Sequence, residues 1–283
     1  MANTNLANAK TAKNDEFYTQ YPDIQKEINA YLDYDPNVFR GKTVLLPCDD
    51  PEWSNFTKFF AQNFELLGLK KLISTSYAPE SKKYKMPYQP TLFETEQPHF
   101  NADKSKTHGK IFVLERDVTG DNRINIEDLQ WQYLEGDGDF RSKEIRKLRD
   151  EADIIVTNPP FSLFREYVAQ LIEYDKKFLI IGHQNAIKYK EIFPLIQQNK
   201  IWLGYGFKGG AGHFISNYED TATAGNHKEG MIRVSGVHWF TNLETKKRHE
   251  DLILYKSYSP EEYPKYENYD AIDVTKTSEI PFD

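Results

Sequence analysis

The sequence predicts an α/β fold built on a mostly parallel, doubly wound sheet. Short apolar runs at 43–46, 154–157 and 178–181 have the length and composition of strands that are buried on both faces. Segments with apolar residues at helical spacing alternate with these runs along the chain. Apolar strands that alternate with amphipathic helices are typical of a sheet covered by helices on both sides.

The first elements are a helix at about 24–32, a strand at 43–46, a helix at about 54–67 and a strand around 72–73. Ser54 is a good N-cap for the second helix, and Gly68 is a good residue to end it. Residues 78–109 contain several prolines, many charges and few aliphatic residues, so we interpret them as an insertion or long loop.

The later elements are a strand at 111–114, a charged helix at about 142–152 and the clearest strand of the chain, at 153–157. A helix follows residue 160, with a strand at 178–181, a helix at about 189–198 and a strand at 201–203 after it. Residues 204–212 are rich in glycine and predict a loop, 237–240 predict a late strand, and the chain from Ser257 is expected to be mostly irregular.

The composition indicates a globular protein with three regions. Hydrophobic residues make up 39% and aromatic residues 14% of the 283 residues, enough for a sizeable core. We expect a flexible N-terminal tail at 1–14, a main domain at 15–204 with the insertion at 78–109, and a further region at 205–283. The N-terminus has no apolar run, so no secretory signal is expected, and no stretch is long enough to span a membrane.

Charge and cysteine content limit the partners. The net charge of −7 argues mildly against a nucleic-acid partner, although basic residues can still cluster on one face. Cys48 is the single cysteine, so an intramolecular disulfide is excluded and a reducing cytoplasm is expected. No metal site is predicted, because the histidines show no paired ligand spacing. We expect a monomer.

The motif that carries chemistry is Asn158-Pro159-Pro160-Phe161, which follows the clearest strand and precedes a helix. In doubly wound sheets, ligands bind outside the carboxyl ends of the strands, so this turn and the turn after Leu46 are candidate sites. Two prolines remove two main-chain donors, and the turn then offers mainly acceptors, the side-chain oxygen of Asn158 and the carbonyl of Pro159.

Such a turn suits an aryl amine such as N6 of adenine, whose lone pair is delocalised into the ring. Two acceptors aimed at its hydrogens would draw the nitrogen toward a tetrahedral form, and Phe161 would stack on the base. A base in duplex DNA must be flipped out to reach the turn. The plain alternative is that Pro159 and Pro160 simply end a strand and start a helix.

The segment Asp153-Ile-Ile-Val-Thr-Asn-Pro-Pro-Phe-Ser-Leu-Phe-Arg-Glu-Tyr167 resembles the catalytic segment of EcoRI-type adenine-N6 DNA methyltransferases. The resemblance runs from about residue 10 to the C-terminus. It extends through the blocks at 15–20, 48–56, 136–142, 177–181, 200–204, 239–243 and 263–266.

The resemblance implies a Rossmann-like S-adenosylmethionine-dependent methyltransferase fold whose last strand is antiparallel. It implies that Asn158, Pro159, Pro160 and Phe161 hold the target adenine. The residues it implies for S-adenosyl-L-methionine are Phe17, Tyr18, Thr19, Pro47, Cys48, Asp49, Asp50, Asp139, Phe140 and Asn158. The turn at 47–50 stands where related enzymes carry a glycine-rich cofactor turn, yet it contains no glycine; a carboxylate there would pair with the ammonium group of the cofactor.

The function expected from the resemblance is site-specific methyl transfer to N6 of adenine in double-stranded DNA, with base flipping. Residues 15–204 would form the catalytic and cofactor-binding domain, and 205–283 the target-recognition region. Two alternatives remain open: the same chemistry on protein glutamine or RNA, and a catalytically impaired relative that only binds DNA.

Other signals are weaker. Pro47-Cys48 is similar to the nucleophile pair of cytosine-C5 methyltransferases but stands at the cofactor turn, where a small buried thiol fits better. The segment 117–128 is similar to a calcium loop, with an Asx turn as the alternative. Residues 204–209 fit a dinucleotide fingerprint, but no helix follows them. The basic side chains could contact DNA or simply form a solvated surface, and the sequence favours neither; they are Lys208, His227, Lys228 and Arg233. For Trp239 and Phe240, packing in the core is favoured over stacking on a base.

Overall fold

The computed structural model describes residues 18–51, 54–79, 95–115, 131–207, 211–215, 231–268 and 270–282. The chain forms two compact units, Met1–Thr245 and Lys246–Asp283. Several predictions lie outside the described residues: the tail at 1–14, the calcium-like segment 117–128, and the side chains of Phe17, Lys208, His227 and Lys228. The insertion at 78–109 is described only in part.

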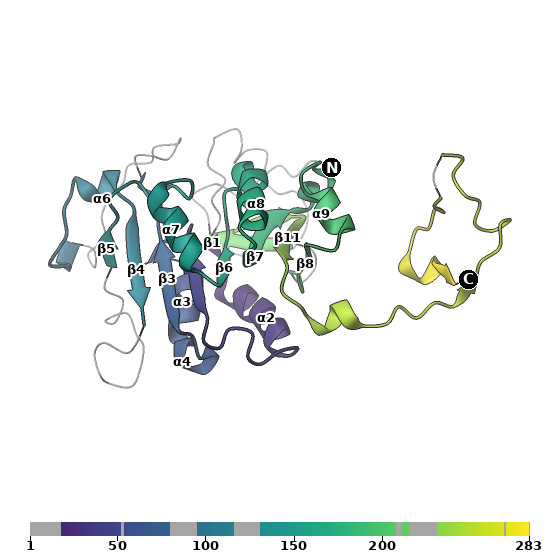
Figure 1. The fold of residues 1–283 in the computed structure, drawn as a ribbon, viewed down its shortest axis with the longest axis horizontal. Coiled ribbons are helices and arrows are strands. Elements are labelled where there is room, and N and C mark those ends of the chain that lie inside the picture. The colour runs from purple at the N-terminus through teal and green to yellow at the C-terminus, as the bar shows by residue number, and fades with distance from the viewer. Residues whose placement is uncertain are drawn as a thin grey trace. The chain divides into compact units, whose positions relative to one another are not determined.

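An eight-stranded sheet forms the centre of the first unit (Figure 1). Its order is β5 (Trp131–Tyr133), β4 (Lys110–Leu114), β3 (Lys71–Thr75), β2 (Thr43–Leu46), β6 (Ile154–Thr157), β7 (Lys177–His183), β11 (Val237–Thr241) and β8 (Trp202–Leu203). The four central strands β3, β2, β6 and β7 are parallel to one another. Antiparallel pairs flank them on both sides, β3–β4 and β4–β5 on one and β7–β11 and β11–β8 on the other.

The predicted α/β fold is confirmed, and the strand that enters this sheet last along the chain, β11, is antiparallel as expected. A second sheet was not predicted. It joins β1 (Tyr18–Thr19), β9 (Ala211–Ile215) and β10 (Ile232–Ser235) in antiparallel order. The prediction of a loop through residue 212 was therefore wrong at its end, because Ala211 and Gly212 pair with β10 and so gain the hydrogen bonds of a strand.

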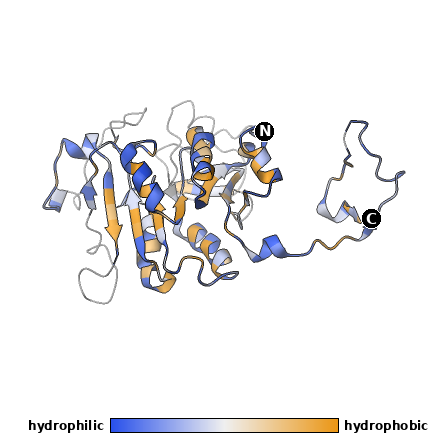
Figure 2. Cartoon of the chain, in the orientation of Figure 1, coloured by the Kyte–Doolittle hydropathy of each residue, from blue (hydrophilic) through white to orange (hydrophobic). Residues whose placement is uncertain are grey.

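Helices cover both faces of the large sheet. On one side lie α2 (Tyr21–Leu32), α3 (Asn55–Gln62) and α4 (Phe64–Leu67), and on the other α7 (Lys143–Glu151) and α8 (Phe164–Glu173). Successive residues of β2 point to opposite sides, so Val44 and Leu46 join the first cluster and Leu45 the second. Figure 2 shows the central strands as strongly hydrophobic, which is typical of a sheet buried on both faces.

Local sequence explains where α3 begins and where α4 ends. The hydroxyl oxygen of Ser54 caps α3 by accepting from the amide of Phe56, and Gly68 ends α4 in the left-handed region at φ 63°. The single helix predicted there is interrupted at Asn63. The side chain of Asn63 donates to the carbonyl of Phe59 and so competes with the helical pattern.

The helix predicted at about 189–198 is also shorter than expected. A 3-10 helix at Gln184–Lys188 precedes α9 (Phe193–Gln197). Pro194 lies in the first turn of α9, where its missing amide is tolerated, so the helix begins there rather than earlier. Another short helix, α6 (Lys104–Thr107), lies within the predicted insertion.

The second unit is mostly irregular, as predicted for the chain from Ser257. Its regular structure among the described residues consists of the parallel pair β12 (Lys256–Ser257) and β13 (Pro281–Phe282) and two 3-10 helices, Lys246–His249 and Thr277–Glu279. The rings of Tyr258 and Tyr263 stack with centroids 6.4 Å apart.

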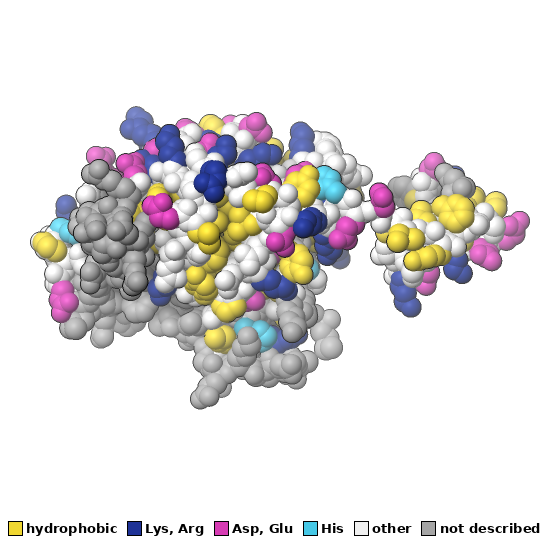
Figure 3. Space-filling model, turned by 90° about the horizontal axis from the view of Figure 1, so that it is seen from below, with side chains coloured by type: hydrophobic (Ala, Val, Ile, Leu, Met, Phe, Trp, Pro, Cys, Tyr) yellow, Lys and Arg dark blue, Asp and Glu magenta, His cyan; other side chains and the backbone are white. Residues whose placement is uncertain are grey.

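The surface carries both signs of charge. Figure 3 shows a face on which lysine and arginine side chains are interspersed with acidic ones and with apolar side chains. Within the described ranges, no helix is both long enough and apolar enough to cross a membrane.

Candidate active site at the carboxyl ends of the central strands

The two turns singled out in the sequence lie side by side at one edge of the sheet. Strands β2 and β6 are parallel neighbours, with Leu45 opposite Ile155, so both end at the same edge. Residues 47–50 follow β2 directly, and residues 158–160 follow β6. This is the edge at which doubly wound sheets bind their ligands.

The carboxylate of Asp49 lies between the two turns and is 6% exposed. Its Oδ1 accepts from the hydroxyl of Ser54 at 2.7 Å, and its Oδ2 accepts from the hydroxyl of Thr157 at 2.7 Å. Burial raises the pKa of Asp49 to about 6, an effect that these two hydrogen bonds oppose and the nearby Asp50 carboxylate reinforces. Both oxygens of Asp49 are thus directed at protein hydroxyls, whereas the sequence predicted a cofactor contact.

Hydroxyl groups on β3 hold the main chain of the glycine-free turn. Ser74 donates to the carbonyl of Asp49 at 2.6 Å, and the side chain of Thr75 donates to the carbonyl of Pro47 at 3.2 Å. The amide of Asp49 donates in turn to the carbonyl of Thr75 at 3.0 Å. Hydrogen bonds to β3 therefore hold the main chain of this turn in place, although the turn contains no glycine.

Asn158 is half-buried and contacts the N-terminal segment. Its Nδ2 donates to the hydroxyl of Thr19 at 3.3 Å, and Asn55 donates to the carbonyl of Thr19 at 2.7 Å. Thr19 belongs to β1, so the short second sheet contacts the turn after β6. Two segments 139 residues apart in the chain, both predicted as site residues, are thus in contact.

The remaining residues of the motif differ in exposure. Pro159 is buried and Pro160 half-buried. The ring of Phe161 is 6% exposed and belongs to the core cluster that also contains Phe56 and Trp239. Stacking of Phe161 on a base stays a prediction, and in this structure the ring packs in the core.

The loop that carries Asp139 and Phe140 packs against the end of β3. The amide of Ala78 donates to the carbonyl of Asp137 at 2.7 Å. Gly138 has φ 80°, and a Cβ there would lie 2.1 Å from the carbonyl oxygen of Ser76, so only glycine fits this close approach.

The two predicted cofactor residues of this loop have protein partners. Arg141 donates to both oxygens of Asp139, at 2.9 and 2.6 Å. Burial alone would raise the pKa of Asp139, but Arg141 outweighs it and the net pKa is lowered. Phe140 is buried edge-on against Tyr167 at 5.0 Å. Burial raises the pKa of the Tyr167 hydroxyl, and the nearby Cys48 and Asp49 in the turn after β2 raise it further.

Cys48 and Asp50 are half-buried at the same turn, and Tyr18 lies in β1. Sequence reasoning missed Thr157 and Asn55 as residues of the site and assigned Ser54 only a capping role. The available signal was a hydroxyl residue at the end of each strand, Thr157 on β6 and Thr75 on β3, next to a turn that bears a carboxylate.

The weaker candidates find structural explanations. The side chains of Trp239 and Phe240 are fully buried in the two core clusters, so the predicted core packing is confirmed. Arg233 is half-buried in β10. Among the residues that the structure describes, no cluster of histidine, cysteine or acidic side chains could hold a metal ion.

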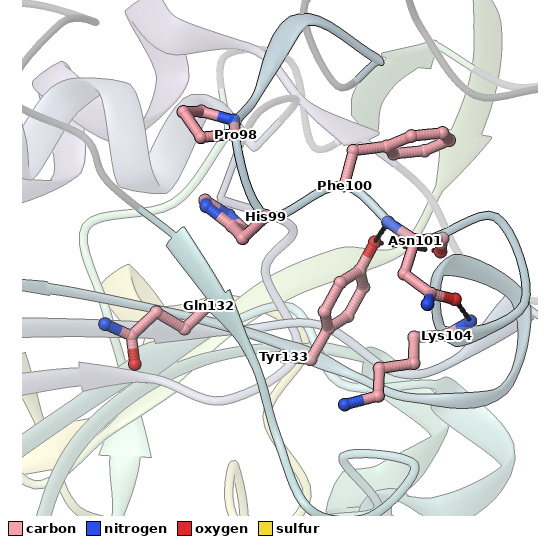
Figure 4. A pocket seen from close by; sticks show the side chains of 7 residues that line it. All are labelled: Pro98, His99, Phe100, Asn101, Lys104, Gln132 and Tyr133. Atoms are coloured by element: carbon pink, nitrogen blue, oxygen red, sulfur yellow. Dashed lines mark hydrogen bonds between the residues drawn. The ribbon is translucent and has the colours of Figure 1, made fainter.

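An open hollow of about 370 Å³ lies elsewhere, between residues 98–104 and β5 (Figure 4). The hydroxyl of Tyr133 accepts there from the amide of Asn101 at 3.2 Å, and Oδ1 of Asn101 accepts from the amide of Lys104 at 2.9 Å. Its lining residues Pro98, His99, Phe100, Asn101, Lys104, Gln132 and Tyr133 include none of the predicted site residues. The hollow is therefore separate from the candidate active site.

Comparison with known proteins assigns the chain to a family. A family model described as the adenine-specific methyltransferase EcoRI matches residues 5–283. The type II methyltransferase M.EcoRI of Escherichia coli is 44% identical over 98% of this chain and 81% of its own length. M.MpnI of Mycoplasma pneumoniae is 36% identical, over 97% of this chain and 76% of its own, and M.MgeORF184P of Mycoplasma genitalium 32% identical, over 97% and 77%. No solved structure matches the chain. This chain belongs to the EcoRI family of adenine-specific methyltransferases.

Proposed function

We propose that this site-specific adenine DNA methyltransferase transfers a methyl group from S-adenosyl-L-methionine to N6 of adenine in double-stranded DNA, with the target base flipped out of the helix. The observation that carries the proposal is the turn Asn158-Pro159-Pro160 at the carboxyl end of β6, with the amide of Asn158 held by Thr19. The bond from Nδ2 to Thr19 orients the carboxamide, so Oδ1 is its acceptor end.

The turn would act on the amine through its acceptors. Oδ1 of Asn158 and the carbonyl of Pro159 would each accept one N–H of the adenine amine, which draws its lone pair out of conjugation with the ring. Holding the nitrogen in this geometry accounts for catalysis by positioning, and no covalent nucleophile is required. Phe161 would stack on the base, which requires its ring, 6% exposed in this structure, to leave part of its core contacts.

The residues at the edge of the sheet fit the cofactor. Cys48 and Asp50 are half-buried in the turn after β2, Thr19 bonds Asn158 in the neighbouring turn, and Phe140 packs on Tyr167. Asp50 would pair with the ammonium group of S-adenosylmethionine. Bound there, the cofactor supplies an electrophilic methyl group. Arg141 holds the carboxylate of Asp139, so contact between Asp139 and the cofactor would require that ion pair to rearrange.

We also propose a role for each region of the chain. Residues 15–204 would form the catalytic and cofactor-binding domain and 205–283 the target-recognition region, although β9, β10 and β11 belong by their packing to the first unit. We propose a monomer, and a cytoplasmic location on the ground that Cys48 is the single cysteine.

The first test is Asn158→Ala. The substitution removes one of two acceptors, and we expect the rate of methyl transfer to fall by about 10²–10³-fold, as when one preorganised polar group is lost from an active site. The matched control is Asn29→Ala on the exposed face of α2, which should retain wild-type turnover. Thermal unfolding of both variants shows whether the fold survives. Near wild-type turnover in Asn158→Ala would refute the assigned role.

The substrate needs a separate test. Radiolabelled S-adenosylmethionine is offered with duplex DNA, RNA and protein in parallel, and the modified base is identified after digestion. We expect label in DNA as N6-methyladenine. Exclusive labelling of protein or RNA would overturn the proposal, and failure of the folded protein to bind S-adenosylmethionine in calorimetry would indicate a relative that only binds DNA.

A further inference from the structure

The buried carboxylate of Asp49 has no part in the chemistry described so far, yet its position is closely determined. It joins three segments: its own turn after β2, the N-cap of α3 through Ser54, and the end of β6 through Thr157. Its main-chain groups bond β3 through Ser74 and Thr75. Every one of these partners lies at the edge of the sheet that carries the proposed active site.

We propose that Asp49 is a positioning residue that ties the turn after β2 to the catalytic turn after β6 and thereby fixes the place of Asn158. This inference rests on the proposed function of the Asn158-Pro159-Pro160 turn. It differs from the role that the family resemblance implied, because Asp49 acts through Thr157 and not on the cofactor.

The geometry supports a positioning role. Thr157 is the last residue of β6 and the neighbour of Asn158, so holding its hydroxyl at 2.7 Å from Asp49 fixes the end of the strand from which the catalytic turn departs. Thr157 is fully buried and its side chain has little freedom to find another partner. The Thr19 bond holds Asn158 from one side and the Asp49–Thr157 bond holds its strand from the other.

The negative charge of Asp49 strengthens its hydrogen bonds to Ser54 and Thr157. An ionised carboxylate accepts two hydroxyl bonds that are shorter and stronger than neutral ones. The titratable groups that interact with it or share its surroundings are the carboxylate of Asp50 and the thiol of Cys48, on the same turn, and the hydroxyl of Tyr167 on α8, and none of the three supplies a positive charge. The hydroxyl groups of Ser54 and Thr157 therefore offset the cost of burying the charge. Removing the hydroxyl of Thr157 should shift the end of β6.

The experiment compares Thr157→Val, Asp49→Asn and the double variant with the wild-type enzyme. Both single changes keep the shape of the side chain. The matched control is Thr241→Val, which also deletes a buried threonine hydroxyl from a strand of the same sheet, but one that bonds Phe178 and Leu243 instead of the site. The measurements are the single-turnover rate of adenine methylation, the Kd for S-adenosylmethionine and the free energy of unfolding.

We expect Thr157→Val and Asp49→Asn each to lower the single-turnover rate by roughly tenfold to a hundredfold, since small misplacements of reacting groups have effects of that size. The Kd for S-adenosylmethionine should stay near its wild-type value. The double variant should be no slower than the slower single variant, because both act through one hydrogen bond. We expect Thr241→Val to lower the free energy of unfolding about as much as Thr157→Val does, while its methylation rate stays at the wild-type value.

Three results would overturn the inference: wild-type rates in both variants, equal loss of rate in Thr157→Val and Thr241→Val, or a weakened Kd for S-adenosylmethionine with an unchanged rate in Asp49→Asn. The last result would make Asp49 a cofactor ligand. If the wild-type protein transfers no methyl group to DNA, the proposed function fails. The same double-mutant cycle, measured on free energies of unfolding, then tests whether Asp49 and Thr157 are coupled. Non-additive stabilities support it, and additive ones overturn it.

Discussion

Asp49→Asn is expected to change the way in which stability depends on pH. The pKa of Asp49 is about 6 in the folded protein, against an ordinary value of 3.8, so the folded state binds a proton in this range that the unfolded state has already released. The free energy of unfolding therefore has a contribution that is fully present below pH 3.8 and is lost as the pH rises through 6. A gap of about two pH units, at about 1.4 kcal/mol each, gives about 3 kcal/mol.

Asparagine does not ionise, so the free energy of unfolding of Asp49→Asn should lack this pH-dependent contribution. Urea unfolding, followed by tryptophan fluorescence at a series of pH values from about 3 to 7.5, gives the free energy of unfolding for both proteins. The difference between variant and wild type should shift by about 3 kcal/mol in favour of Asp49→Asn as the pH rises. Other titrating groups are common to both proteins and cancel. A difference that is the same at both ends of the range would show that Asp49 is not held as a desolvated carboxyl group.

Three further substitutions test packing, hydrogen bonding and helix capping elsewhere in the first unit. Tyr31→Phe deletes a buried hydroxyl that donates to the buried carboxylate of Glu27 at 2.7 Å, and should lower the free energy of unfolding by about 1.5–3 kcal/mol; a change near zero in urea unfolding would contradict this. Ser142→Ala removes the hydroxyl that caps α7 and should lower it by about 1 kcal/mol, seen as a reduced Tm, whereas an unchanged Tm would mean that the cap contributes nothing. Gly182→Ala places a Cβ 2.4 Å from the ring of Phe164 and should cost about 1–3 kcal/mol; wild-type stability would show that the ring moves aside freely.

The elements that the sequence predicted well are those governed by local periodicity. The buried strands at 43–46 and 154–157 and the apolar faces of α2 and α8 follow from the spacing of their own residues. The position of the Asn158-Pro159-Pro160 turn at a strand end follows from the same pattern. The family resemblance added the antiparallel last strand, which no local pattern in 237–240 contains.

What escaped prediction depends on contacts between distant segments. β1 has only two residues, and it is a strand because Tyr18 and Thr19 pair with Ile215 and Phe214 almost two hundred residues later. The inward direction of Asp49 depends on Thr157, which lies 108 residues away. A carboxylate next to a strand end can face a ligand or the interior with equal local propensity, so only the tertiary structure decides between them.

The place of β11 in the large sheet has a consequence for synthesis. Although it comes last along the chain, β11 lies between β7 and β8 and bonds both. Until the ribosome has released residue 241, the nascent chain has two unpaired strand edges where β11 will insert, and such edges invite pairing with other chains. Premature termination upstream of Val237 should therefore yield an aggregation-prone product rather than a smaller working enzyme.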